Sequence, residues 1–195
     1  MKIKPIEIIG NWDKGYVLDR HVLLSVPKGE NVYGHMEFET TRTELGELLF
    51  LFKNRNSYNC LDEIIKIIAP FLDAWEDLKD VDIVLPVPPT KQRESYQPAN
   101  EIAQAISKHL NISFFDGVLE NISREQMKNT SKANRDIKGK IIVKMKATKQ
   151  HSILLVDDLF DTGSTMRECV SVLREDPKLK KIYVLAMTKT RGESL

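Results

Sequence analysis

The chain has 195 residues, of which 42% are hydrophobic and 29% are charged, and its formal net charge at pH 7 is +1. This composition is typical of a globular protein that can bury its own core without disulfides or metals. A nearly neutral chain has no overall electrostatic attraction for nucleic acid or an anionic membrane, so any basic contact surface must be local.

The N-terminal part of the chain is predicted to form a β-hairpin. Residues 16–26 are β-prone, residues 27–31 supply turn residues, and a second extended stretch covers residues 32–39. We therefore expect residues 1–40 to form a hairpin segment and residues 41–195 to form the main domain.

Two helices are expected next. The first begins near Thr41, where Glu44 three residues later completes a possible capping box, and ends by Asn54. The second covers residues 61–75, which place apolar side chains on one helical face, although Pro70 must kink or shorten it.

From residue 81 onward, short apolar runs alternate with helical ones, which is the pattern of parallel βα units. One of the runs, residues 152–156, is continuously apolar and indicates a central strand buried on both faces. In chain order, we expect strand 81–87, helix 98–110, strands 112–119, 140–143 and 152–156, a helix to about residue 174, and strand 182–187.

Cysteine spacing argues against a zinc or redox site, and the distribution of apolar residues argues against a signal peptide or a membrane span. Cys60 and Cys169 are far apart and neither belongs to a CxxC pair, which indicates free cytosolic thiols rather than a zinc ribbon or a redox motif. The N-terminal stretch MKIKPIEIIGNWDK lacks a signal-type apolar run, and no apolar run reaches 18 residues. We therefore expect a cytoplasmic protein with no membrane partner.

The segment ILLVDDLFDTGST, residues 153–165, has the features of a sugar-phosphate site. A Gly/Ser/Thr turn that opens a helix offers backbone N–H groups, hydroxyls and a positive dipole end to a phosphate. The carboxylates of Asp157 and Asp158 repel phosphate and suit hydroxyls or a hydrated cation. Ribose 5-phosphate would satisfy both halves. In a plainer interpretation, the acids and the turn only cap the helix and solvate the strand end.

This segment resembles the thirteen-residue phosphoribosyl pyrophosphate (PRPP) signature of type I phosphoribosyltransferases. The resemblance implies an α/β fold, with a parallel sheet flanked by helices and a small N-terminal hairpin and helical appendage. It implies that Asp157 and Asp158 engage the ribose hydroxyls, directly or through Mg²⁺ and water. The 5-phosphate would be bound by Asp161, Thr162, Gly163, Ser164 and Thr165. Asp161 is also a candidate general base, with a simple turn acid as the alternative.

A looser resemblance, over about residues 45–192, is to the ComF family of predicted amidophosphoribosyltransferase-like proteins. It is carried by FKNR at residues 52–55, VLPVPPTKQRESYQ at residues 84–97 and RDIKG at residues 135–139. The sequence departs from that family in two places. The usual N-terminal four-cysteine zinc ribbon has no counterpart here, and the FNQ element after the first strand reads YQP.

The loop after the first parallel strand occupies the place of the pyrophosphate loop in type I phosphoribosyltransferases. Pro88, Lys91 and Arg93 are the candidate pyrophosphate ligands there. Cations suit this position because pyrophosphate leaves with developing negative charge. The alternative is a solvated turn stiffened by its prolines.

The one strong charge run lies between Arg124 and Lys149, where nine basic residues face two acids, a balance of 9 − 2 = +7. It could form the flexible loop that closes over PRPP in this family, with contacts from Arg124, Lys128, Lys132 and Arg135. Contact with nucleic acid and a disordered, solvated loop are the alternatives, although the absence of aromatic residues weakens the first.

The sequence thus predicts a Mg²⁺-dependent phosphoribosyltransferase that binds PRPP and transfers its 5-phosphoribosyl group to a nitrogen acceptor. The alternative is a PRPP or nucleotide sensor, or a DNA-uptake accessory protein, that keeps the fold without turnover. The identity of the acceptor and the oligomeric state, a homodimer included, remain open.

Overall fold

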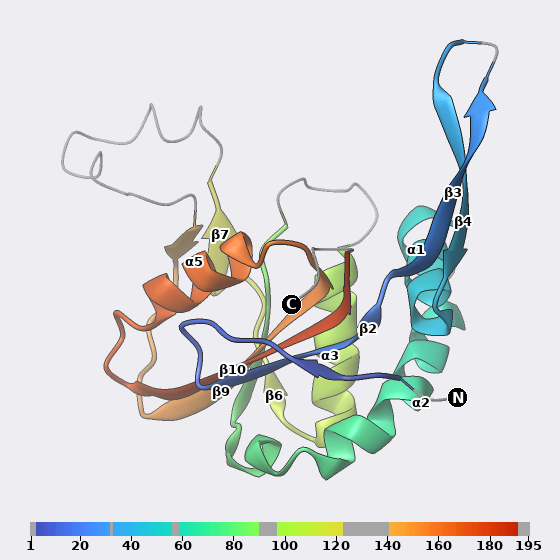
Figure 1. Cartoon of the computed structure of the whole chain (residues 1–195). Helices are drawn as coiled ribbons and strands as arrows, with labels where there is room; N and C mark the ends of the chain where they lie inside the picture. The colour runs from blue at the N-terminus through green and yellow to red at the C-terminus, as the bar shows by residue number, and fades with distance from the viewer. Residues whose placement is uncertain (1–2, 32, 56–58, 90–96, 123–140, 191–195) are drawn as a thin grey trace, which may run out of the picture.

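The computed structural model describes residues 3–31, 33–55, 59–89, 97–122 and 141–190 (Figure 1). Its centre is a six-stranded sheet in the order β1-β2-β10-β9-β5-β6. Strand β1 is antiparallel to β2, and the remaining strands run parallel to their neighbours, as the sequence predicted for an α/β protein. These strands are β1 (Ile6–Glu7), β2 (Lys14–Arg20), β5 (Ile83–Pro86), β6 (Ser113–Phe114), β9 (His151–Phe160) and β10 (Leu179–Lys189).

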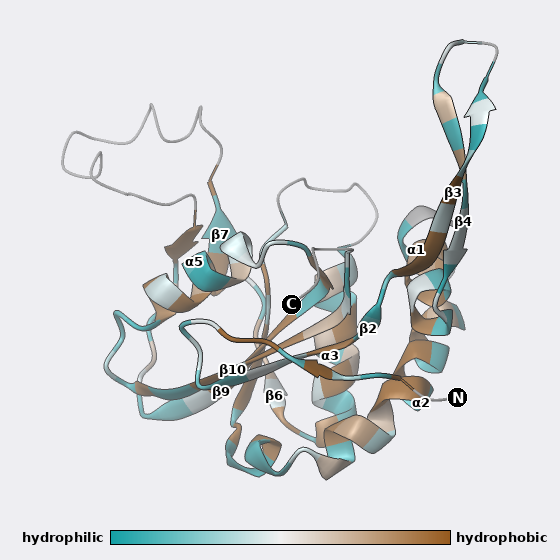
Figure 2. Ribbon diagram, in the orientation of Figure 1, coloured by the Kyte–Doolittle hydropathy of each residue, from teal (hydrophilic) through white to brown (hydrophobic). Residues whose placement is uncertain are grey.

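Helices cover both faces of the sheet. One face carries α1 (Glu44–Arg55), α2 (Asn59–Ala74) and α3 (Pro98–Leu110), and the other carries α5 (Ser164–Leu173). A short 3-10 helix, Glu76–Asp80, leads from α2 into β5. Apolar residues concentrate along the central strands and the helix surfaces that pack on them (Figure 2).

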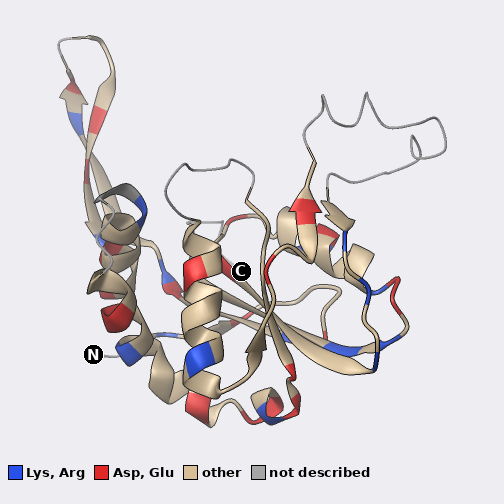
Figure 3. Ribbon diagram, turned by 180° about the vertical axis from the view of Figure 1, so that it is seen from behind, with Lys and Arg blue, Asp and Glu red and all other residues tan. Residues whose placement is uncertain are grey.

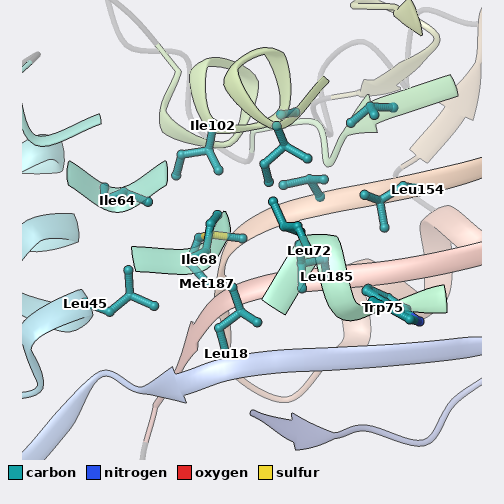
Figure 4. Packing of buried hydrophobic residues seen from close by; sticks show 14 of the residues in the cluster. Leu18, Leu45, Ile64, Ile68, Leu72, Trp75, Ile102, Leu154, Leu185 and Met187 are labelled. Carbon is teal, nitrogen blue, oxygen red and sulfur yellow. The ribbon is translucent and has the colours of Figure 1, made fainter. Parts of the chain in front are cut away.

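Apolar side chains alternate along β9, so helices must pack on both faces of the sheet to bury them. Leu154 and Val156 pack into the cluster with α1, α2 and α3 that Figure 4 shows, whereas Ile153 and Leu155 pack into the cluster with α5. A strand buried on both faces reads as a continuous apolar run, which is the pattern that predicted it.

The chain reverses its direction of winding between β5 and β9. After β5 it passes through α3 to β6, and after β9 it passes through α5 to β10 on the other side of the sheet. Ligands of such sheets bind in the crevice beyond the carboxyl ends of the two strands that flank this reversal. The acids that follow Val156 lie at this place.

The predicted hairpin exists, but its first strand begins later than expected. Residues 14–20 form β2, which pairs with β10 in the central sheet, and the hairpin consists of β3 (Val22–Glu30) and β4 (Met36–Arg42). The expected boundary at residue 40 falls inside β4. The hairpin projects from the body (Figure 1), and large apolar side chains are exposed on it, namely Leu23, Leu24, Val26, Tyr33, Met36 and Phe38.

In the second half of the chain, the sequence prediction was wrong about the strand expected at residues 112–119. The expected strand 112–119 is interrupted by a turn at Gly117, whose φ is +71° and whose N–H donates to the Asp116 carboxylate at 2.7 Å. Beyond the turn, β7 (Leu119–Asn121) pairs with β8 (Ile141–Val143) in a separate antiparallel sheet. Helix α3, by contrast, has the predicted bounds.

The described ribbon carries acidic and basic residues interspersed over its length (Figure 3), in keeping with the formal net charge of +1. Within the described part of the chain, no helix combines the length and the apolar character needed to cross a membrane.

Candidate functional site

Strand β9 continues through the acids that were expected to follow it. Its pairing with β10 extends as far as Phe160 and Lys189, whereas its pairing with β5 ends at Val156 and Pro86. From Asp157 onward, the side of β9 that faces β5 is therefore no longer covered by a paired strand. The acids lie at the open carboxyl end of the switch point.

Asp157 and Asp158 point to opposite faces of β9 because successive side chains alternate along a strand. Asp157 shares its face with Ile153 and Leu155, and its carboxylate Oδ1 accepts a 2.8 Å hydrogen bond from the backbone N–H of Asp158. Burial, and then the charge of Asp158, raise the pKa of Asp157 to about 7. The Asp157 carboxyl is therefore partly protonated near neutral pH.

Behind Asp157, on the α5 side, lies the thiol of Cys169. Burial raises the pKa of Cys169, and the charge of Asp157 raises it further. The thiol is fully buried and stays protonated, so it acts as packing beneath the acid rather than as a nucleophile.

Asp158 lies on the other face and forms an ion pair. Lys53 Nζ, from the last turn of α1, is 2.8 Å from Asp158 Oδ2, and the two side chains are only 19% and 16% exposed. His21, at the end of β2, lies near this pair, and its Nδ1 is 3.1 Å from the hydroxyl of Thr188. Burial, Lys53 and Arg42 lower the pKa of His21, which keeps its imidazole neutral at pH 7.

The Gly/Ser/Thr turn opens α5 as the sequence predicted. Gly163 precedes the helix with φ +75°, and a Cβ added there would lie 2.4 Å from the Phe160 ring. The N–H of Arg167 donates to the Gly163 carbonyl at 2.9 Å and so begins the helical hydrogen bonding. The N–H groups of the preceding turn have no partner inside the helix, and such groups bind anions.

Arg167 and the N-terminal loop hold this turn in place. Arg167 Nη1 donates to the Thr162 carbonyl at 2.8 Å, and its guanidinium lies 5.7 Å from the Trp12 ring centre. Asn11 Nδ2 donates to the Arg167 carbonyl at 2.9 Å. Arg167 was not among the site residues predicted from the sequence. Its signal was a cation in the first turn of a helix, where the dipole disfavours it unless a specific partner compensates.

Asp161 is tied to the end of the neighbouring strand. The hydroxyl of Thr190, just beyond β10, donates a short hydrogen bond to Asp161 Oδ1, and the Thr190 N–H donates to the Phe160 carbonyl at 3.1 Å. The Asp161 side chain is exposed, and none of the described residues donates to its second oxygen.

Comparison with known proteins identifies the family. Residues 61–194 match the family described as phosphoribosyl transferase domain. The chain belongs to this family. Its fold is accordingly the type I phosphoribosyltransferase fold that the sequence predicted.

Individual relatives of this phosphoribosyl transferase domain are distant. Amidophosphoribosyltransferase of Pasteurella multocida (strain Pm70) is 30% identical over 112 residues, which cover 56% of this chain and 20% of that protein. The chain thus matches about a fifth of the length of this curated relative.

Solved structures with a similar arrangement include adenine phosphoribosyl transferase of Trypanosoma brucei, with a TM-score of 0.49 and 12% identity. That match covers 97% of this chain and 87% of the other. Orotate phosphoribosyltransferase of Aeropyrum pernix has a TM-score of 0.45 and 16% identity, over 89% of this chain and 78% of the other.

The residues that the structure describes include part of the predicted site of this phosphoribosyl transferase domain. The acids and the turn at residues 157–165 share one edge of the sheet, and the N–H of Val87 donates to the Val156 carbonyl at 2.8 Å, so the buried Pro88 follows at the same edge. The other predicted ligands lie outside the described residues: Lys91, Arg93, Arg124, Lys128, Lys132 and Arg135.

The carboxylates of Asp157 and Asp158 are oxygen ligands of the kind that Mg²⁺ prefers. The mutual repulsion of Asp157 and Asp158 would be relieved by an added cation. Within the described ranges, no three His, Cys, Asp or Glu side chains gather as a metal cage. The described part of the chain could therefore offer such an ion at most two carboxylate ligands, and the remaining ligands would have to come from elsewhere.

Proposed function

We propose that the protein binds PRPP at the carboxyl ends of β5 and β9 and transfers its 5-phosphoribosyl group to a nitrogen acceptor, with release of pyrophosphate. The observation that carries the proposal is the placement of the two carboxylates and the turn at Gly163 at one edge of the sheet. Sugar hydroxyls and a terminal phosphate need opposite electrostatic environments, and this edge carries both carboxylates and the N-terminus of a helix.

In the proposed complex, the turn from Asp161 to Thr165 binds the 5-phosphate. First-turn N–H groups of α5 and the hydroxyls of Thr162, Ser164 and Thr165 are the donors, and Gly163 lets the backbone approach the phosphate closely. Asp157 and Asp158 accept hydrogen bonds from the ribose hydroxyls or contact the metal. Mg²⁺ bound to the diphosphate would neutralise charge that develops on the leaving group.

The reaction that fits this arrangement is a nitrogen-for-oxygen exchange at the anomeric carbon. The lone pair of the acceptor nitrogen forms the new bond to that carbon, and the bond from the carbon to the pyrophosphate oxygen breaks with its electron pair leaving on pyrophosphate. The proton lost by the acceptor passes to the Asp161 carboxylate, whose orientation Thr190 fixes. Lys91 and Arg93 are proposed to receive the pyrophosphate together with the backbone near Pro88.

The finer assignment to ComF-like amidophosphoribosyltransferases rests on two sets of matches. One is the set of short motifs in the sequence, and the other is the 30% identity to an amidophosphoribosyltransferase over 112 residues. It favours ammonia or a small amine among the nitrogen acceptors that we propose to test, beside purines and pyrimidines.

The direct test measures pyrophosphate released from PRPP by the purified protein, with Mg²⁺ and a panel of purines, pyrimidines, ammonia and amines. We expect release that depends on one class of acceptor. Calorimetry with PRPP should accompany the screen. Binding without release for any acceptor would contradict the transferase proposal and indicate a sensor, and absence of binding would contradict the PRPP site itself.

A further inference from the structure

Lys53 and Asp158 form an ion pair between the region that precedes the family match and the matched region itself. Asp158 lies in the matched range, residues 61–194, and Lys53 lies before it, in the last turn of α1. The 2.8 Å distance between Lys53 Nζ and Asp158 Oδ2 is that of a direct charge-assisted hydrogen bond. With both side chains less than a fifth exposed, water screens this pair less than it screens an ion pair on the surface.

Helix α1 delivers Lys53 to this place from a fixed position. Leu45, Leu49 and Phe52 bury one side of the helix in the core that Figure 4 shows in part. Its start is held by Thr43, whose hydroxyl donates to the Arg20 carbonyl at 2.6 Å and accepts the Gly46 N–H at 3.0 Å. The ammonium group therefore approaches Asp158 from a packed helix and not from a loop.

As far as the described residues show, one oxygen of Asp158 is left for a ligand. Lys53 engages Oδ2, and no described residue donates to Oδ1. The neighbouring His21 is neutral and bonded to Thr188, so Lys53 is the positive partner that the structure pairs with this carboxylate. An unpaired Asp158 beside Asp157 would suffer like-charge repulsion and would be free to rotate toward solvent.

We propose that Lys53 is a positioning residue of the PRPP site: it holds the Asp158 carboxylate through Oδ2 so that Oδ1 faces a ribose hydroxyl. This inference rests on the proposed function, because it assigns how one of the ribose-binding acids is oriented. It also gives the N-terminal helix, which lies outside the matched family range, a part in substrate binding.

The test uses ribose 5-phosphate, which has the hydroxyls and the 5-phosphate but no pyrophosphate. We expect Lys53→Met to weaken binding of ribose 5-phosphate and of Mg²⁺-PRPP by a similar factor of about ten, the loss of one hydrogen bond to a charged group. Lys53→Arg should retain most of the affinity. Lys66→Met, at an exposed lysine on α2, is the control and should bind as the wild type does.

A double-mutant cycle separates positioning from independent contact. If Lys53 acts through Asp158, adding Lys53→Met to Asp158→Asn should change the affinity by less than about twofold. The inference would be overturned if the affinity losses of Lys53→Met and Asp158→Asn multiplied in the double variant, or if Lys53→Arg lost as much affinity as Lys53→Met. A loss of affinity for PRPP alone would also overturn it, because it would place Lys53 on the pyrophosphate. Wild-type affinity in Lys53→Met would overturn it while leaving the proposed function intact. A wild-type protein that binds neither ligand would overturn both.

Discussion

The guanidinium of Arg167 donates a 2.8 Å hydrogen bond to the carbonyl oxygen of Thr162, so helix α5 also holds in place the turn that precedes it, the proposed phosphate-binding turn. A positive side chain in the first turn of a helix opposes the helix dipole by itself. Here it is offset by the Thr162 carbonyl and by the Trp12 ring, and the same charge lies near the proposed phosphate.

We expect Arg167→Met to weaken binding of ribose 5-phosphate by about 5- to 30-fold, because the turn loses a hydrogen bond and the site loses a positive charge. Calorimetry measures the affinity, and thermal unfolding should show a melting temperature only a few degrees lower. Lys180→Met, at an exposed lysine on β10, is the matched control. An affinity equal to that of the control would remove Arg167 from the phosphate site.

Gly163 should not tolerate a side chain. Its φ of +75° costs other residues about 1–2 kcal/mol, and a Cβ would also lie 2.4 Å from the Phe160 ring, which packs edge-on against Trp12. Gly163→Ala should therefore destabilise the protein by about 2–4 kcal/mol and abolish phosphate binding.

Gly117→Ala is a sharp control for the Gly163 variant. Gly117 has nearly the same φ, +71°, but an added Cβ would meet no described residue within 4 Å beyond its chain neighbours, so only the backbone strain is introduced. We expect about 1 kcal/mol of destabilisation and unchanged phosphate binding. If both alanine variants behaved alike in urea unfolding and in calorimetry, the close approach at Gly163 would have no role.

Features of the fold that depend on neighbouring residues were predicted from the sequence, whereas features that depend on distant residues were not. The apolar strand at Ile153, the turn that opens α5, and α3 were predicted well because each is encoded by neighbouring residues. The start of the hairpin was misplaced because residues 14–20 pair with β10, more than 160 positions away, and local propensity does not contain that partner.

The same reasoning applies to the site. Asp157, Asp158 and the turn were predicted from one contiguous motif, whereas Lys53, Arg167 and Thr190 act through contacts that only the fold creates. Alternation along β9 also directs the two acids to opposite faces of the strand, which the motif alone did not indicate. Thr190 follows the carboxyl end of a central strand, a position where polar residues often serve ligands, and this was a usable signal.

Asp161 is proposed as the base that accepts the proton of the nitrogen nucleophile. Asp161→Asn should lower the turnover by about 10²- to 10⁴-fold and spare PRPP binding, because the amide keeps the hydrogen bond with Thr190 but cannot take a proton. Thr190→Val should lower turnover far less, since the carboxylate remains and only its orientation is loosened. Steady-state rates of pyrophosphate release, paired with calorimetry, measure both effects. Full activity in Asp161→Asn would refute the assignment as base.

Asp157 should reduce the stability of the folded protein in a pH-dependent way. Its pKa of about 7 in the folded protein lies above the ordinary carboxyl value of 3.8. The folded state therefore retains a proton that the unfolded chain releases, and the stability linked to this group is full below pH 4 and is lost as the pH rises to about 7. A carboxylate that destabilises the fold when ionised is consistent with a residue kept for ligand binding.

We expect Asp157→Asn to raise the free energy of unfolding by about 1–3 kcal/mol at pH 8 and to leave it nearly unchanged at pH 4, since the amide has no charge to bury. Its oxygen can still accept the Asp158 N–H. The same variant should weaken Mg²⁺-PRPP binding, because it removes a negative charge from the ribose and metal site. Urea unfolding from pH 4 to pH 8 and calorimetry measure the two effects, with Glu63→Gln on the exposed side of α2 as the control. A gain in stability that did not grow with pH would contradict the burial of a charged Asp157, and unchanged PRPP affinity would remove it from the site.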